Sequence, residues 1–395
     1  MRLKDIVSLN PDALKESTPD NYTFRYVDLS AVHDGVIDYP RSAVRFGEAP
    51  TRARRLAREG DTLIATVFAK APEVASVRRL DFPTVFSTGF CVARPRPEIA
   101  DARYVTYLCA SVQFGQFEAA RLRGVGIPSV SPTDIGAFPV ELPPLQEQRR
   151  IADYLDEQSN HVSQLKAATL RQSSLSRERF ESALVQHFAP SRDGIEELEL
   201  RRVLSSIKTG STPMIPEADP DHGFIPWYTP TSIGAYATLG GPVRKFPQTS
   251  SDQLTRFNAD SILVVGIGES IGNVAYLDHS AAGNQQLTAL RPNASMLTRY
   301  LLWQLWVKRS EHREQSSFTR VRILNNEYLK SVRIVRVPVE QQASVVRTID
   351  TERERLSGLL ARLASRIELA VQRLDALTSL AVTGQLDVTT ARKAA

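Results

Sequence analysis

The segments Pro144-Leu-Gln-Glu-Gln148 and Pro338-Val-Glu-Gln-Gln342 decide the fold, because they are two versions of one helix start placed 194 residues apart. The similarity also extends upstream, where Gly60-Asp-Thr-Leu-Ile64 matches Ala259-Asp-Ser-Ile-Leu263 at an offset of 199. A repeat of this length has the size of a whole domain. The sequence therefore predicts a duplicated unit, each copy consisting of a globular domain followed by a long helix.

Length and composition place the chain among ordinary globular proteins. It has 395 residues, of which 42% are hydrophobic and 24% charged, enough for two or three domains with cores of their own. Its start lacks a signal-type apolar segment and no window approaches the roughly 18 apolar residues of a membrane span, so we expect a cytoplasmic protein with no membrane partner. Cys91 and Cys109 are not in a metal-type spacing, and we expect no structural zinc.

The two globular segments share one α+β plan. Strands are expected at Tyr22–Leu29, Thr62–Phe68 and Gly89–Ala93, followed by a helix near Tyr104–Ala120. The second segment repeats this plan with strands at Ser261–Val265 and Leu287–Leu290 and a helix at Arg299–Arg313. Prolines close each globular segment before its long helix. The expected boundaries are a globular domain at 1–142, a helical segment at 143–190, a globular domain at 191–337 and a helical segment at 338–395.

The second long helix carries an apolar residue at alternating steps of four and three, which predicts a coiled-coil seam. Its members are Leu356, Leu360, Leu363, Ile367, Ala370, Leu374, Leu377 and Ala381. The first helix has a weaker seam, since Thr169, Gln172 and Ser176 occupy apolar positions. Two equivalent helices pack most simply as an antiparallel coiled coil, and about 40 residues would hold the domains on the order of 60 Å apart. The alternative is a plain helical dimerisation arm.

Charge distribution favours a polyanionic partner. Net charge is +5, and residues 198–336 contain 16 basic and 11 acidic residues. Contact residues are expected in loops that place donors beside glycine or aromatic residues, and in basic stretches. The candidates for DNA binding are Lys208, Thr209, Ser211, Thr212, Tyr228, Thr229, Thr231, Ser232, Arg320, Arg322, Arg121, Arg123, Arg52, Arg54 and Arg55. The basic ones could equally be solvated surface charges, and Trp227 is expected to anchor the core rather than stack on a base.

Sequence motifs for catalysis are missing. The chain has no Asp/Asn-Pro-Pro-Tyr/Phe tetrapeptide, no Gly-x-x-x-x-Gly-Lys-Ser/Thr phosphate loop and no His-Glu-x-x-His. Gly266-Ile-Gly-Glu-Ser-Ile-Gly272 places its third glycine one residue too late for a dinucleotide fingerprint, so a turn between strands is expected. We therefore predict neither a cofactor nor a metal.

Taken together, these motifs resemble the specificity subunit of type I restriction-modification systems. The second half carries the more specific match, and its motifs follow in the order typical of a target recognition domain: Lys208-Thr-Gly-Ser-Thr-Pro213, Ile225-Pro-Trp-Tyr228, Ala259–Leu263, Ser270-Ile-Gly-Asn-Val-Ala275 and Asn284-Gln-Gln-Leu-Thr-Ala-Leu-Arg-Pro292. Ala381-Val-Thr-Gly-Gln-Leu-Asp-Val388 resembles the tail of the family's second conserved region. The first half departs, because no Thr-Gly-Ser-Thr-Pro lies near its start.

The resemblance implies a non-catalytic subunit. Each target recognition domain would read one half of a bipartite site in double-stranded DNA, and the helices would set the gap and dock two methyltransferase subunits. ATP-dependent restriction subunits would join a larger assembly. Two alternatives remain: a freestanding DNA methyltransferase or nuclease with degenerate motifs, and a protein-binding helical scaffold.

Overall fold

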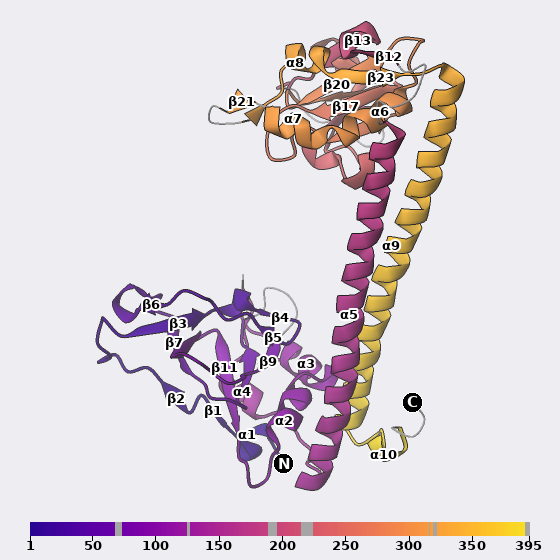
Figure 1. Cartoon of the computed structure of the whole chain (residues 1–395). Helices are drawn as coiled ribbons and strands as arrows, with labels where there is room; N and C mark the ends of the chain where they lie inside the picture. Colours follow the sequence, from indigo (N-terminus) through magenta and orange to yellow (C-terminus); the bar gives the residue numbers. More distant parts are fainter. Residues whose placement is uncertain are drawn as a thin grey trace. The chain divides into compact units, whose positions relative to one another are not determined.

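Two long helices organise the fold of this computed structural model: α5 (Leu145–His187) and α9 (Val339–Val382). They pack against each other, and they run antiparallel, because the start of α5 shares a core with the end of α9 while the end of α5 shares one with the start of α9 (Figure 1). The predicted antiparallel pair is confirmed. The structure describes residues 1–67, 73–124, 127–188, 196–214, 224–315, 317–318 and 322–391.

The residues that form the helical seam are those expected from the sequence pattern in α9, whereas in α5 one seam position differs from the pattern. In α9, Leu356, Leu363 and Ala381 are buried and the intervening seam positions are half-buried. In α5, Thr169 is buried and Ser176 half-buried as expected, but Gln172 is exposed. Ser173 takes its place, since a short hydroxyl side chain fits against a neighbouring helix where a glutamine would have to bury its amide.

The chain divides into unit 1 (Met1–Thr169 with Ala364–Ala395) and unit 2 (Leu170–Leu363). Unit 1 contains a four-stranded sheet in the order β1-β11-β8-β9 and a five-stranded sheet in the order β2-β7-β10-β3-β6. Their bounds are β1 (Val7–Leu9), β11 (Phe90–Pro95), β8 (Thr62–Ala65), β9 (Val74–Ser76), β2 (Asp12–Ala13), β7 (Ala53–Leu56), β10 (Thr84–Ser87), β3 (Thr23–Val27) and β6 (Val44–Arg45). A hairpin of β4 (Val32–His33) and β5 (Val36–Ile37) completes the strands described for this unit.

Helices cover one face of the four-stranded sheet of unit 1. They are α1 (Leu3–Ile6), α2 (Ala102–Cys109), α3 (Val112–Ala119), α4 (Pro132–Gly136) and α10 (Val388–Ala391), together with the start of α5 and the end of α9. Ile64 faces these helices, whereas Leu63 faces the second sheet, as the two-residue period of a strand requires. Both faces of β8 are therefore buried, which explains its unbroken apolar run.

Unit 2 repeats this architecture. Its four-stranded sheets have the orders β13-β20-β17-β18 and β15-β14-β19-β16. The bounds are β13 (Leu204–Thr209), β20 (Leu287–Pro292), β17 (Ser261–Val265), β18 (Val274–Leu277), β15 (Arg244–Pro247), β14 (Phe224–Tyr228), β19 (Ala281–Gly283) and β16 (Arg256–Phe257), with two small ribbons, β12 (Glu196–Glu199) with β23 (Arg333–Arg336) and β21 (Ser317–Phe318) with β22 (Arg322–Ile323). Its helices are α6 (Thr298–Val307), α7 (Arg309–Gln315) and α8 (Asn326–Ser331), with the end of α5 and the start of α9.

The main strands of the two units correspond, and this correspondence corrects the alignment read from sequence by one residue. The parallel pair β3–β10 of unit 1 corresponds to the parallel pair β14–β19 of unit 2. Leu63 pairs with Ala75 and Leu263 pairs with Ala275, so this hairpin repeats at an offset of 200 instead of 199. An error of one residue would turn every side chain of the strand to the opposite face.

A buried glutamine joins each long helix to its globular domain, and this is the role of the repeated Glu-Gln motif. Gln148 Nε2 donates to the carbonyls of Ile99 and Pro143, and its Oε1 accepts from the amide of Asp101. In unit 2, the Gln342 amide makes the equivalent three bonds, to the carbonyls of Ser295 and Val337 and from the amide of Leu297. Both glutamines are completely buried, so the first turn of each helix is fixed to the loop that precedes α2 or α6.

Within the described ranges, none of the helices combines the length and apolar character needed to cross a membrane.

Candidate nucleic-acid interface

The Lys208–Pro213 segment is shaped by a close crossing of two backbones in unit 2. β13 ends at Thr209, and Gly210 then passes over the turn that precedes β20, where its amide donates to the Leu287 carbonyl and the Ser211 amide donates to that of Gly283. A Cβ atom at Gly210 would lie 2.2 Å from the Gly283 carbonyl oxygen. Glycine is therefore required here, and two of the sequence motifs, Lys208–Pro213 and Asn284–Pro292, lie against each other. We call this region the strand crossing.

The strand crossing presents polar side chains at its surface. Lys208, Thr209 and Thr212 are exposed, as expected for contact residues. The Thr212 hydroxyl donates to Gln285 Oε1 at 2.5 Å, and Thr209 Oγ1 lies 3.2 Å from Asn326 Nδ2. Gln285 and Asn326 were not among the candidates, although Gln285 belongs to a quoted motif and lies just before the expected strand Leu287–Leu290.

Ser211 points inward. Its hydroxyl contacts the amide and hydroxyl of Thr255, and its carbonyl accepts from Trp227 Nε1 at 3.2 Å. Trp227 is buried with Ile225 and Phe246, which confirms that it anchors the core.

The segment from Tyr228 to Ser232 divides into buried and accessible residues. Tyr228 is 3% exposed and its hydroxyl lies 3.0 Å from His279 Nε2, while Ser232 is 6% exposed. Thr229 and Thr231 remain accessible, and their hydroxyls lie 2.7 Å apart. Of these four candidates, Thr229 and Thr231 are therefore the ones that a ligand can reach.

The candidate arginines of unit 1 also differ in what they contact. Arg54 stacks over Phe46 and Arg121 lies 3.5 Å from the centroid of the Phe117 ring, and each donates to a neighbouring carbonyl. Arg55 is half-buried. Arg52 is exposed, and the Arg123 side chain is 79% exposed and lies 3.6 Å from an Asp134 carboxylate oxygen. Arg52 and Arg123 are the most accessible cations of this set.

Arg320 lies outside the described residues. For Arg322, the structure describes the backbone alone, which pairs with Phe318 in the small ribbon. The predicted alternation of the two arginines across Val321 therefore stays a prediction.

The described residues of unit 1 form no strand crossing, which fits the lack of a Thr-Gly-Ser-Thr motif near the start of its sequence. β1 ends at Leu9, and Asn10 adopts a left-handed conformation with φ of 47°. Its side-chain oxygen accepts from the Val92 amide, so the asparagine replaces one backbone hydrogen bond of the strand. The chain then turns to the second sheet, where Asp12 forms an ion pair with Arg94, and this pairing holds the pKa of the Asp12 carboxyl below its usual value.

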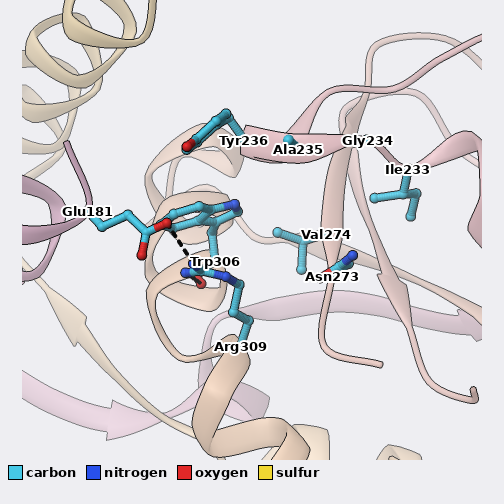
Figure 2. A pocket seen from close by; sticks show the side chains of 9 residues that line it. All are labelled: Glu181, Ile233, Gly234, Ala235, Tyr236, Asn273, Val274, Trp306 and Arg309. Carbon is cyan, nitrogen blue, oxygen red and sulfur yellow. Dashed lines mark hydrogen bonds and ion pairs between the residues drawn. The ribbon is translucent and has the colours of Figure 1, made fainter. Parts of the chain in front are cut away.

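A pocket of about 330 Å³ opens in unit 2 beside Trp306 (Figure 2). Tyr236 stacks on Trp306, and Arg309 lies over the same indole at 3.6 Å. Glu181 on α5 forms an ion pair with Arg309 at 3.1 Å, as the dashed line in Figure 2 marks. Phe180 packs edge-on against Tyr236 and Trp306. The aromatic rings stack on one another, and the two charged side chains form an ion pair. We therefore interpret this pocket as the packed junction between α5 and the globular part of unit 2.

Two buried titratable side chains stand apart from the surface candidates. Glu118 is fully buried in unit 1 with neither carboxylate oxygen hydrogen-bonded to a described residue, and burial raises its pKa to about 8. His312 is buried in unit 2, and burial lowers its pKa to about 4. Its Nδ1 lies 3.1 Å from the Tyr328 hydroxyl. Among the described residues, no cluster of three metal-binding side chains occurs.

Comparison with known proteins identifies the family. The model for the type I restriction modification DNA specificity domain matches residues 1–172 and again residues 194–368. The chain belongs to this family. The resemblance inferred from the motifs is confirmed, and so is the duplication, because the two matches fall on the two halves. No curated protein sequence matches the chain.

Two solved structures share the fold over nearly the whole chain. One comes from work on complex assembly and conformational transition of the type I R-M system; it is 24% identical, with a TM-score of 0.77, and the match covers 98% of this chain and 97% of the other. The second is the HsdS subunit from Thermoanaerobacter tengcongensis, with 23% identity, a TM-score of 0.53 and coverage of 98% and 96%. Membership in the family supports a role in DNA sequence specificity.

Proposed function

We propose that this chain is the DNA-recognition subunit of a type I restriction-modification complex, in which unit 1 and unit 2 each read one half of a bipartite site. The observation that carries the proposal is the double match to the specificity-domain family, one match on each half. The two units share their main strand order but differ in surface, because among the described residues the strand crossing occurs in unit 2 alone. Such a pair is suited to reading two different half-sites.

In this proposal, α5 and α9 set the gap between the half-sites. The helices contain 43 and 44 residues, so a straight helix of this kind is about 65 Å long at 1.5 Å per residue. The buried Gln148 and Gln342 fix their first turns to the globular domains. Two readers joined by a stiff spacer bind as linked ligands, and the spacer length determines which gap allows both to bind.

The same helices would dock two methyltransferase subunits. Apolar side chains remain exposed on them, with Leu170 at 68% and Leu175 at 54% on α5 and Leu369 at 65% on α9. Substituting Leu170 and Leu369 by lysine should reduce co-purification with a co-expressed methyltransferase subunit of the same restriction-modification system. Exchange of the exposed Gln372 by lysine serves as the control.

We further propose that the chain performs no chemistry by itself and that a larger assembly adds ATP-dependent restriction subunits. DNA contacts in unit 2 would come from Lys208, Thr209, Thr212, Thr229 and Thr231, and in unit 1 from Arg52 and Arg123. Contacts to phosphate position such a domain, and contacts to base edges give it sequence preference.

The test is to purify the chain together with its methyltransferase subunit and to map the bases methylated in genomic DNA. We expect methylation at one bipartite sequence, and none when the chain alone receives S-adenosylmethionine. Replacing residues 1–142 by the corresponding domain of another member of the family should change one half of the site and leave the other. A change in both halves would contradict independent reading, and methylation by the isolated chain would favour a freestanding enzyme.

A further inference from the structure

Four amide side chains gather at the strand crossing of unit 2, and they fall into two pairs. Asn284 and Gln286 form two hydrogen bonds with one another. Asn284 Nδ2 donates to Gln286 Oε1 at 2.7 Å, and the backbone amide of Gln286 donates to Asn284 Oδ1 at 3.1 Å. These two side chains stabilise the turn. Gln285 is exposed and Asn326 is half-exposed, and each contacts a threonine of the crossing strand instead.

The threonine contacts hold the two outer side chains beside the crossing strand, and the contact of Thr212 determines which way the Gln285 amide faces. The Thr212 hydroxyl donates to Gln285 Oε1, which uses one of the two lone pairs of that oxygen; within the described part of the chain, both Nε2 protons and the other lone pair are left for a ligand. Both polar atoms of the Asn326 amide lie near Thr209 Oγ1, Nδ2 at 3.2 Å and Oδ1 at 3.4 Å, and this hydroxyl lies 3.0 Å from Thr288 Oγ1 on β20. Both threonines belong to backbone fixed by the Gly210 crossing. Holding a side chain in place before binding reduces the entropy lost when the complex forms.

An amide edge with one donor and one acceptor complements a particular base. Asparagine and glutamine form paired hydrogen bonds with the N7 and N6 atoms of adenine in the major groove. Lys208 lies on β13 next to Thr209, and its exposed ammonium group can neutralise a DNA phosphate nearby. We infer that Gln285 and Asn326 determine the specificity of unit 2, each by reading the adenine of an A·T pair. This inference rests on the proposed DNA-recognition function and names the chemistry of one half-site.

The corresponding position in unit 1 has a different chemistry. Phe90 pairs with Ala65 as Leu287 pairs with Val265, so Thr88 takes the place of Gln285. Thr88 is exposed, and its amide donates to the carbonyl of Arg52. The glutamine side chain at this position is therefore specific to unit 2. The half-site read by unit 1 supplies an internal control for correct folding.

The experiment selects DNA ligands for the full-length chain from a pool of duplexes with a randomised block, followed by sequencing. We expect the wild-type chain to enrich a bipartite motif with invariant A·T pairs in one half. Gln285→Ala and Asn326→Ala should each relax the preference at one A·T pair by about five- to 150-fold and leave the other half of the motif unchanged. Gln285→Glu should shift that pair towards C·G, because a carboxylate accepts from cytosine N4.

Lys208→Ala is the matched control. It should weaken binding to every duplex and reduce the slope of log affinity against log salt by about one, with the same enriched motif as wild type. If both alanine variants enrich the wild-type motif, the assignment of Gln285 and Asn326 is wrong while the proposed function stands. If the wild-type chain shows no salt-dependent binding and enriches no motif, the proposed function and the inference both fail.

Discussion

Replacing Gln342 by alanine tests how the long helices are held to the globular domains. The substitution removes three hydrogen bonds of 2.7 to 3.0 Å from a fully buried site and leaves the carbonyls of Ser295 and Val337 and the amide of Leu297 without this partner. A buried polar group that loses its partner costs about 1–3 kcal/mol. Because the polar space left by the glutamine can admit a water molecule, we expect the low end for each group, a loss of about 3 kcal/mol in total.

The assay has a global and a local readout. With a urea slope of about 2 kcal/mol/M, the unfolding midpoint of unit 2 should fall by about 1.5 M. Hydrogen exchange should accelerate at the Leu297 amide and stay slow at the Asp101 amide, which Gln148 protects in unit 1. Gln341→Ala is the matched control, since Gln341 is exposed beside Gln342. Equal midpoints for the Gln341 and Gln342 variants would refute the reasoning.

Two further predictions concern the strand crossing and the buried carboxyl. Gly210→Ala should lower the stability of unit 2 by more than about 2 kcal/mol and abolish the sequence preference of its half-site, because the new methyl group would lie 2.2 Å from the Gly283 oxygen. Gly241→Ala, with no atom within 4 Å of the added carbon, should be neutral in the same urea titration; similar losses for both would count against the crossing. Burial raises the pKa of Glu118 to about 8 in the folded state, from about 4.5 for an ordinary glutamate, so the folded state retains a proton that the unfolded state loses, and stability should fall as pH rises from about 4.5 to 8. Glu118→Gln should remove this decline and be more stable than wild type at pH 8 by more than about 1 kcal/mol, with the exposed Glu98→Gln as control; parallel pH profiles for wild type and Glu118→Gln would contradict an unpaired buried carboxyl.

Elements with a strong local pattern could be predicted from sequence. The apolar run Ser261–Val265 is β17 with the same bounds, and the four-three spacing of α9 gave the correct seam. The helix expected near Tyr104–Ala120 is in fact two helices, because Ser111 turns inward and its hydroxyl accepts from the Phe114 amide to start α3. A serine within an otherwise helical stretch does not by itself reveal such a cap.

The candidate site was less predictable, because its geometry depends on residues distant in sequence. Gly210 must be glycine on account of the Gly283 carbonyl, 73 positions further along the chain. Gln285 and Asn326 become candidates only once Thr212 and Thr209 are seen beside them. Tyr228 and Ser232 carry hydroxyl groups that suggested a surface, yet both are buried: Tyr228 is the last residue of β14, and Ser232 ends the short helical turn after it. The repeated glutamine was visible as a motif, but the loops it bonds to could not be identified from its neighbours.

The most direct test of the central claim measures DNA affinity as a function of the gap between half-sites. Once the bipartite motif is known, duplexes are made with the gap lengthened or shortened by one to five base pairs, each step moving one half-site by about 3.4 Å along the axis and rotating it by about 35°. The complex of this chain with its methyltransferase subunits should bind one gap length best and lose at least tenfold in affinity two base pairs away. Equal affinity across all gaps would contradict an account in which paired helices hold two readers at a set separation.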